Sequence, residues 1–170
     1  MCLLEMNARE TSICSSASCT LHTPAGMLLL TASSTHLLSC RWVEEASIRQ
    51  LSLAASNEVL AQAVSQLQAY FNGTRHSFCV PIRAKGTSFQ QTVWQALLDV
   101  PYATTLSYAR LASLIGRPTA VRAVANACHC NPLAVIIPCH RIVGSNGKLI
   151  GYAGGLAAKR FLLDLEGQGQ

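Results

Sequence analysis

The sequence predicts an α+β protein, in which a small N-terminal sheet-plus-helix domain precedes a mostly helical C-terminal domain with a helix-turn-helix. The 170 residues are 50% hydrophobic and 12% charged, a composition that can bury a core. Short apolar runs separated by turn residues come first, and apolar residues at helical spacing follow. These patterns divide the chain into a flexible tail at 1–18, an N-terminal domain at 19–85 and a C-terminal domain at 86–170.

The N-terminal domain is predicted to contain hairpin strands and one helix. Between residues 19 and 43, the sequences Thr23-Pro24-Ala25-Gly26 and Ser33-Ser34-Thr35 interrupt the apolar runs, which is typical of strands joined by turns. Residues 57–71 carry apolar side chains at helical spacing and stop at Asn72-Gly73. Residues 78–82 are consistent with a further strand, and residues 83–86 with a linker.

The C-terminal domain is predicted to be built from capped helices. Thr87 or Ser88 caps a helix that ends before Pro101, and Ser107 caps a helix over 108–115. After a break at 116–118, Thr119 caps a helix that runs to about residue 128. The apolar run 133–137 fits a short buried strand or an extended segment. A last helix covers 156–165 and is closed by Gly167.

The charge distribution favours a polyanionic partner for the C-terminal half. Residues 1–85 hold six Lys and Arg against five Asp and Glu, whereas residues 86–170 hold seven against three. This asymmetry is compatible with nucleic acid, or with a mildly basic protein that has no such partner. No apolar stretch approaches the roughly 20 residues of a membrane span, and no secretory signal is recognisable. We therefore expect no membrane partner and a cytoplasmic location, or a nuclear one in a eukaryote.

The eight cysteines do not suggest disulfides or a metal site. None lies in a CxxC pair, and most are expected to be small buried hydrophobic residues. A site formed by Cys128-His129-Cys130 with Cys139-His140 is the alternative, but zinc ligands are usually spaced by two or more residues. No metal is predicted.

The helix beginning near residue 120 has an unusual predicted outer face. Helical geometry places Val121, Val124, Ala125 and Cys128 on an inner face. The opposite face holds one long cation among small residues, namely Arg122, Ala123, Asn126 and Ala127, with Ala120 at the border. Small residues would let the helix approach a narrow groove while an inserted side chain fills a disturbed base stack. A helix packed on both sides would have the same composition, and these residues alone do not separate the two.

The segment Pro138-Cys139-His140-Arg141 holds a candidate nucleophile. Pro138 favours an extended backbone before it, so Cys139 lies where a buried apolar run emerges. His140 and Arg141 would make the surroundings electropositive and favour the thiolate. The alternatives are a structural cysteine beside a surface histidine, and a Cys-His hydrolase, which would also need an oxyanion hole. A cofactor-dependent methyltransferase is not indicated, because no Gly-rich nucleotide-binding turn is present.

The same segment closely resembles the O6-alkylguanine-DNA alkyltransferase family. The resemblance covers nearly all of residues 86–167 and is weaker before them, where it rests on Thr23-Pro24-Ala25-Gly26 and Tyr70-Phe71-Asn72-Gly73. The other matching segments, in order along the chain, are Phe89-Gln90-Gln91, Val93-Trp94, Ser107-Tyr108, Arg122-Ala123-Val124, Asn131-Pro132, Gly151-Tyr152, Gly154-Gly155, Lys159 and Leu165-Glu166-Gly167.

The resemblance implies a role for each matching residue. Cys139 would accept the alkyl group, with His140 reaching it through a water and Glu166 beyond. Tyr108 would protonate the leaving guanine, Arg122 would fill the space of the flipped base, and Asn131 would form a hinge. The residues implied at the DNA are Ser107, Tyr108, Ala120, Arg122, Ala123 and Ala127. Those implied in the substrate pocket are Pro138, Tyr152, Ala153 and Lys159.

The implied function is direct-reversal DNA repair by a single-turnover enzyme without a cofactor. Its partner would be double-stranded DNA containing O6-alkylguanine, bound by a monomer through the minor groove, with O4-alkylthymine left open as a substrate. A non-catalytic protein that binds alkylated DNA and recruits other repair is the alternative, although such relatives lack the acceptor cysteine. Two departures stand out. Ala153 replaces a polar residue of some members, and the N-terminal cysteines and histidines do not fall on the zinc pattern that others have.

Overall fold

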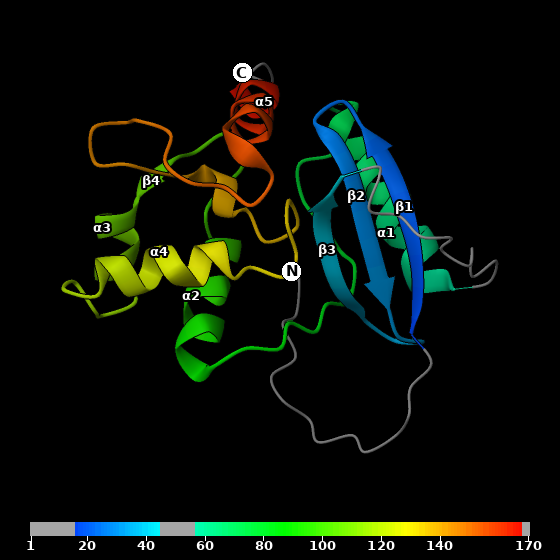
Figure 1. Ribbon diagram of the computed structural model, residues 1–170, viewed down its shortest axis with the longest axis horizontal. Helices are drawn as coiled ribbons and strands as arrows, with labels where there is room; N and C mark the ends of the chain where they lie inside the picture. Colours follow the sequence, from blue (N-terminus) through cyan, green and yellow to red (C-terminus); the bar gives the residue numbers. More distant parts are fainter. Residues whose placement is uncertain (1–15, 45–56, 168–170) are drawn as a thin grey trace.

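The computed structural model describes residues 16–44 and 57–167 and confirms the predicted α+β class. A three-stranded sheet with one helix forms the N-terminal unit, and the remaining helices form the C-terminal unit beside it (Figure 1). The interface between the two units runs along one edge of the sheet and past the last helix. This arrangement matters for function because residues from both units meet there.

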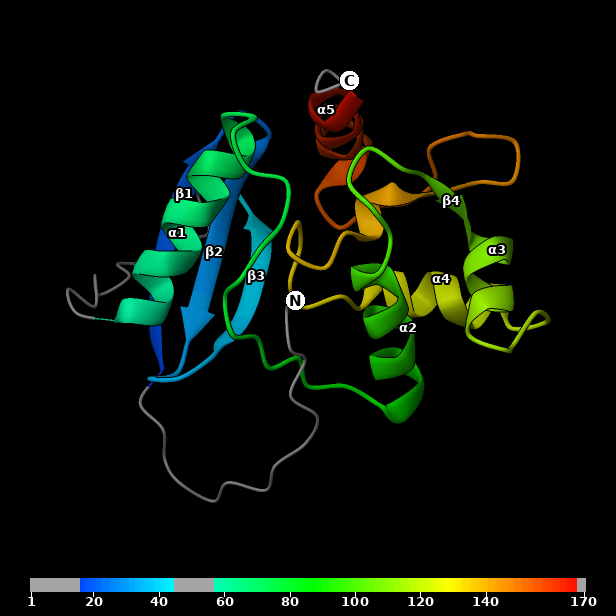
Figure 2. The same cartoon turned by 180° about the vertical axis from the view of Figure 1, so that it is seen from behind.

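The sheet is an antiparallel meander of β1 (Ala17–Thr23), β2 (Gly26–Ala32) and β3 (Leu37–Val43), in that spatial order. The first turn is tight because Gly26 adopts a φ of 128° and the Thr23 hydroxyl donates to its carbonyl at 2.6 Å. α1 (Glu58–Phe71) covers one face of the sheet (Figure 2), and Asn57 caps it by accepting from the Leu60 amide. β1 begins at Ala17, so residues 17 and 18, which we placed in the tail, belong to the sheet, while residues 1–15 of the predicted tail lie outside the described residues.

The outer edge of β3 is hydrogen-bonded to two segments distant in sequence. Leu37 exchanges backbone hydrogen bonds with Pro81 and Arg83, and Cys40 exchanges them with Pro132 and Ala134. The segment 78–82, which we expected to be a strand, forms only an isolated bridge at Ile82. The second pair of bonds attaches the C-terminal unit directly to the sheet edge.

The helices of the C-terminal unit lie close to their predicted positions. They are α2 (Ser88–Leu98), α3 (Tyr108–Leu114), α4 (Val121–His129) and α5 (Gly155–Gly167). Thr87 caps α2 in a capping box with Gln90, and Ser107 caps α3. The predicted cap of α4 is wrong, because the N-cap is Ala120 and no side chain caps this helix. α3 and α4 pack together as the expected helix–turn–helix pair.

The apolar run 133–137 is buried but is not a strand. It folds into a turn in which Val135 has a φ of 71°, an unusual conformation for a β-branched residue. A short 3₁₀ helix, η2 (Cys139–Arg141), follows, and then β5 (Ile142–Val143) pairs in parallel with β4 (Leu106–Ser107). The turn and the 3₁₀ helix bring Cys139 to the wall of a cavity.

Candidate active site

Cys139 lies at the start of η2, 6% exposed, in the wall of a cavity of about 290 Å³. The cavity is bounded by α3, α4 and the loop that precedes α5. Its walls include Tyr108, Arg122, Cys128, Cys139 and Tyr152. The structure therefore gathers four other side chains in the cavity that holds the Cys139 thiol, and three of them, Tyr108, Arg122 and Tyr152, are predicted site residues.

Asn131 holds both the thiol and the backbone around it. Its side-chain amide donates to Cys139 Sγ at 3.2 Å and to the Ile137 carbonyl at 2.8 Å. Its carbonyl oxygen accepts from the Leu133 amide at 3.0 Å. The sequence analysis expected a hinge and did not foresee the direct contact with sulfur. A hydrogen-bond donor at this position stabilises negative charge on the thiol.

The Cys139 thiol is neutral in the resting protein. Burial raises its pKa above the usual value, while the hydrogen bond from Asn131 and the charge of Lys159 act in the opposite direction without cancelling it. We expected His140 and Arg141 to provide the positive charge, and this is wrong. Burial lowers the pKa of His140, which keeps the ring neutral, and Arg141 is paired with Glu166. A proton acceptor must therefore generate the thiolate.

His140 is positioned to be that acceptor. Its Nε2 lies 2.9 Å from Glu166 Oε1, a contact that fixes the proton on Nε2 and leaves the lone pair on Nδ1. Nδ1 is buried and makes no hydrogen bond to any described residue. A basic nitrogen without a protein partner, one residue from the thiol, suits a water-mediated proton transfer from Cys139.

Glu166 is the most heavily hydrogen-bonded side chain of the site. Burial raises its pKa, but hydrogen bonds from His140 and Arg141 outweigh that effect and lower the pKa to about 2. Its Oε2 also accepts from the backbone amide of Ala103 at 3.1 Å, and Ala103 has a φ of 59°. Glu166 is thus a permanent carboxylate that can stabilise a proton on His140.

Two tyrosines line the cavity. The Tyr108 hydroxyl donates to the Ile150 carbonyl at 3.2 Å, and burial raises its pKa to about 12, so it remains a proton donor. Trp42 in β3 donates from its indole nitrogen to the Tyr152 hydroxyl at 3.1 Å. Gly154 permits this contact, because a Cβ there would lie 2.6 Å from the Trp42 ring. The N-terminal unit thereby helps to position the cavity wall.

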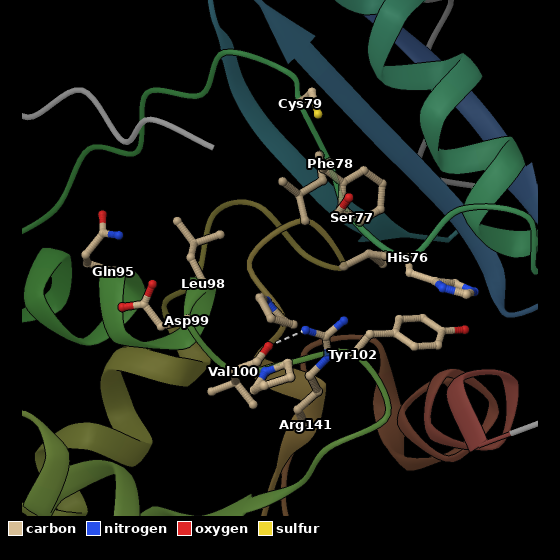
Figure 3. A pocket seen from close by; sticks show the side chains of 14 residues that line it. His76, Ser77, Phe78, Cys79, Gln95, Leu98, Asp99, Val100, Tyr102 and Arg141 are labelled. Atoms are coloured by element: carbon tan, nitrogen blue, oxygen red, sulfur yellow. Dashed lines mark hydrogen bonds between the residues drawn. The ribbon is translucent and has the colours of Figure 1, made fainter. Parts of the chain in front are cut away.

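Three predicted pocket residues do not line this cavity. Lys159 is 0% exposed and donates to the carbonyls of Ile142, Ile150 and Gly151, so it braces the loop behind the wall. Ala153 is exposed to solvent and contributes no side chain to the cavity. Pro138 lines a different cavity, between the segments 76–79 and 98–102. Figure 3 shows this second cavity with other lining residues, among them His76, Tyr102 and Arg141.

The exposed face of α4 differs from the prediction at one position. Arg122, Ala123 and Asn126 are exposed and Ala120 is half-buried, but Ala127 is only 1% exposed. α2 packs against α4 on this side, and the indole nitrogen of Trp94 donates to the Ala127 carbonyl at 2.8 Å. Arg110 on α3 and Arg117 in the turn before α4 are also exposed cations, and they are not among the predicted site residues.

Within the described residues, no group of three or more His, Cys, Asp or Glu side chains is arranged to hold a metal ion. In the same part of the chain, no helix combines the length and the apolar character that crossing a membrane requires.

Comparisons with known proteins match both halves of the chain. Residues 18–84 match the model described as the 6-O-methylguanine DNA methyltransferase, ribonuclease-like domain, and residues 88–168 match the DNA binding domain of the same name. Fold and site thus define a DNA-binding protein built around a buried cysteine. A methylated-DNA–protein-cysteine methyltransferase of Mycobacterium leprae is 44% identical over 84% of this chain and 87% of its own length. The chain belongs to the 6-O-methylguanine DNA methyltransferase family.

Solved structures agree with this assignment. The Mycobacterium tuberculosis O6-methylguanine methyltransferase superposes with a TM-score of 0.80 at 40% identity, covering 92% of this chain and 95% of that one. The same mycobacterial protein in complex with DNA gives a TM-score of 0.79 at 43% identity, covering 88% and 92%. The similarity spans both units of the fold.

Proposed function

We propose that this chain repairs O6-alkylguanine in double-stranded DNA by moving the alkyl group onto Cys139. The family assignment supports direct-reversal repair by alkyl transfer to a cysteine. The observation that carries the choice of residue is the hydrogen bond from Asn131 to the Cys139 thiol, next in sequence to a His140 that is paired with Glu166. Six cysteines lie in the described residues and all are free, which suits a reducing, cytoplasmic location.

The chemistry follows from the geometry. His140 Nδ1 takes the thiol proton through a water, and Asn131 stabilises the sulfur anion. The thiolate attacks the alkyl carbon, so a C–S bond forms while the bond between that carbon and guanine O6 breaks. Tyr108 donates a proton to the departing guanine, which would otherwise be a poor leaving group. The thioether product has no easy exit, so each molecule acts once.

The reacting carbon of an intact duplex is out of reach inside the base stack, so the damaged nucleotide must be flipped into the cavity. We propose that α4 approaches the minor groove through its small exposed face at Ala123, with Ala120 and Ser107 close to the backbone, and that Arg122 fills the vacated space. Asn131, between α4 and the active-site turn, would transmit the docking of the helix to the thiol. We propose that a monomer is sufficient.

The direct test is the intact mass of the protein after incubation with excess duplex containing O6-methylguanine. We expect each molecule to gain one methyl group, located on Cys139, and the reaction to stop at one equivalent. Repeated turnover or modification of another cysteine would contradict the mechanism. Damage-specific binding without any gain of mass would favour the alternative, a non-catalytic protein that recruits other repair.

The relay predicts a specific pH dependence for Glu166→Gln. The carboxylate stabilises the imidazolium that forms when His140 accepts the thiol proton, so its loss raises the effective pKa of Cys139. We expect transfer to slow about tenfold near neutral pH, which corresponds to roughly one pKa unit. The deficit should shrink as pH rises, because hydroxide then removes the proton directly.

The Glu166→Gln variant is best assayed with free O6-benzylguanine, which needs no base flipping. Asp164→Asn on the exposed side of α5 is the matched control, since it also removes one carboxylate. Because a buried ion pair with Arg141 is broken, the free energy of unfolding should fall by roughly 3 kcal/mol. Equal slowing at every pH would show that Glu166 takes no part in the proton relay and has a structural role instead.

A further inference from the structure

The N-terminal unit supplies a hydroxyl to the proton relay. Tyr70 lies in the last turn of α1, is 0% exposed, and donates to Glu166 Oε1 at 2.7 Å. The same hydroxyl lies 3.5 Å from His140 Nε2. Among the described N-terminal residues, Tyr70 is the side chain with a recorded hydrogen bond to the carboxylate. The sequence analysis noted it only as part of a weakly matching segment.

Tyr70 and His140 share one carboxylate oxygen. Glu166 Oε1 accepts from Tyr70 at 2.7 Å, from Arg141 Nη2 at 2.8 Å and from His140 Nε2 at 2.9 Å. Each strong donor disperses part of the negative charge, so each weakens the hold of that oxygen on the other protons. Tyr70 is not needed to hold the Glu166 carboxylate in place, because Arg141 already binds both of its oxygens and the Ala103 amide binds Oε2.

We propose that Tyr70 acts through Glu166: its hydroxyl competes with His140 for Oε1 and thereby sets how readily Cys139 gives up its proton. Without this hydroxyl, Glu166 would hold the proton on His140 Nε2 more strongly. A more basic His140 ring accepts the thiol proton more easily at Nδ1. Tyr70 thus limits how readily the Cys139 thiol loses its proton. Through this residue, the N-terminal unit affects the reactivity of Cys139.

The charged and titratable groups around Glu166 mostly differ from those around Cys139, so a change at Tyr70 acts directly on the Glu166 end of the relay. The titratable or charged side chains that interact with Glu166 are Tyr70, Tyr102, His140, Arg141 and, more weakly, Tyr152. Those that face Cys139 are Tyr108, Cys128, Tyr152 and Lys159. Burial raises the pKa of Tyr70, and Glu166 raises it further, so the hydroxyl stays protonated and remains a donor.

Tyr102 offers a matched control from the same interface. Its ring lies 6.2 Å from that of Tyr70, stacks on His76, and lies under the Arg141 guanidinium (Figure 3). Its hydroxyl, however, donates to the Leu165 carbonyl and makes no recorded hydrogen bond to Glu166. Tyr102→Phe therefore removes a neighbouring hydroxyl without changing the donors on the carboxylate.

The experiment is a pH titration of Cys139 reactivity towards iodoacetamide in the full chain, followed by mass spectrometry of the Cys139 peptide. We expect Tyr70→Phe to lower the apparent pKa of Cys139 by about half a unit, which gives about threefold more thiolate at neutral pH. Tyr102→Phe should leave it unchanged. At high pH, transfer from free O6-benzylguanine should be equally fast in all three proteins, which shows that the cavity is intact.

A second substitution keeps the proposal testable if Tyr70→Phe folds poorly. Incorporation of 3-fluorotyrosine at position 70 keeps the hydroxyl and makes it a stronger donor, so the apparent pKa of Cys139 should rise. An unchanged or raised pKa in Tyr70→Phe, or a lowered one with 3-fluorotyrosine, would overturn the proposal. This inference rests on the proposed relay, but the titration needs no DNA. A negative result in the titration can therefore be told apart from a failure of the protein to accept an alkyl group from DNA.

Discussion

Cys139→Ala is expected to abolish alkyl acceptance completely while leaving DNA binding intact. The substitution removes the nucleophile and leaves the exposed side chains of α4, which we propose meet the DNA, unchanged. Incubation with duplex containing O6-methylguanine should produce no gain of mass, whereas the unsubstituted protein gains one methyl group per molecule. Binding to the same duplex, measured by fluorescence anisotropy, should remain within about twofold of the unsubstituted protein.

Cys128 provides the control for this result, because it is a second buried thiol in the wall of the same cavity. Burial raises its pKa to about 12, and no recorded hydrogen bond from Asn131 or His140 reaches it. Cys128→Ala should therefore still accept one methyl group. Methylation of Cys128 in the Cys139→Ala protein would show that the cavity, rather than the relay, selects the acceptor.

Arg122→Ala is expected to slow repair of duplex DNA by tenfold or more while hardly affecting transfer from free O6-benzylguanine. Arg122 is exposed at the rim of the cavity, where it can occupy the place of an extruded base. Unstacking costs on the order of a few kcal/mol, so loss of this support raises the barrier only when a base must leave a stack. Single-turnover rates on the two substrates separate the steps.

Arg110→Ala and Arg117→Ala are matched controls that remove the same charge from other exposed positions of the α3–α4 pair. If Arg122 only neutralised phosphate, all three variants would weaken binding to damaged and undamaged duplex alike and reduce the salt slope by about one unit. If Arg122→Ala instead loses the same rate on duplex and on free base, Arg122 supports the shape of the cavity or the stability of the fold.

The helices could be predicted because their signals are local. Asn57, Thr87 and Ser107 each accept a hydrogen bond from a backbone amide in the first turn, as their residue types suggest. The segment 133–137 was misjudged because a run of branched apolar residues looks the same in a buried strand and in a buried turn. Its conformation depends on hydrogen bonds to Asn131 and to Cys40, which local sequence does not reveal.

The site was predictable where the family motif specifies residue types, and not where tertiary contacts decide the geometry. Ala127 was placed outside by helical periodicity, but α2 packs against that side of α4 and buries it. Lys159 was placed in the pocket, but three backbone carbonyls hold its ammonium group behind the wall. Tyr70 could not be identified as a partner of Glu166, because the two residues are 96 positions apart and meet only in the folded protein.

The pairing along β3 has a consequence for the integrity of the chain. An unpaired outer strand is a template for association with other polypeptides, and proteins protect such edges. Here Pro132 and Ala134, from the segment that leads to Cys139, cover part of the β3 edge. Separating the two units at the linker before α2 would expose this backbone and free the active-site turn. The halves are thus interdependent for solubility, and proteolysis at the linker would promote aggregation as well as inactivation.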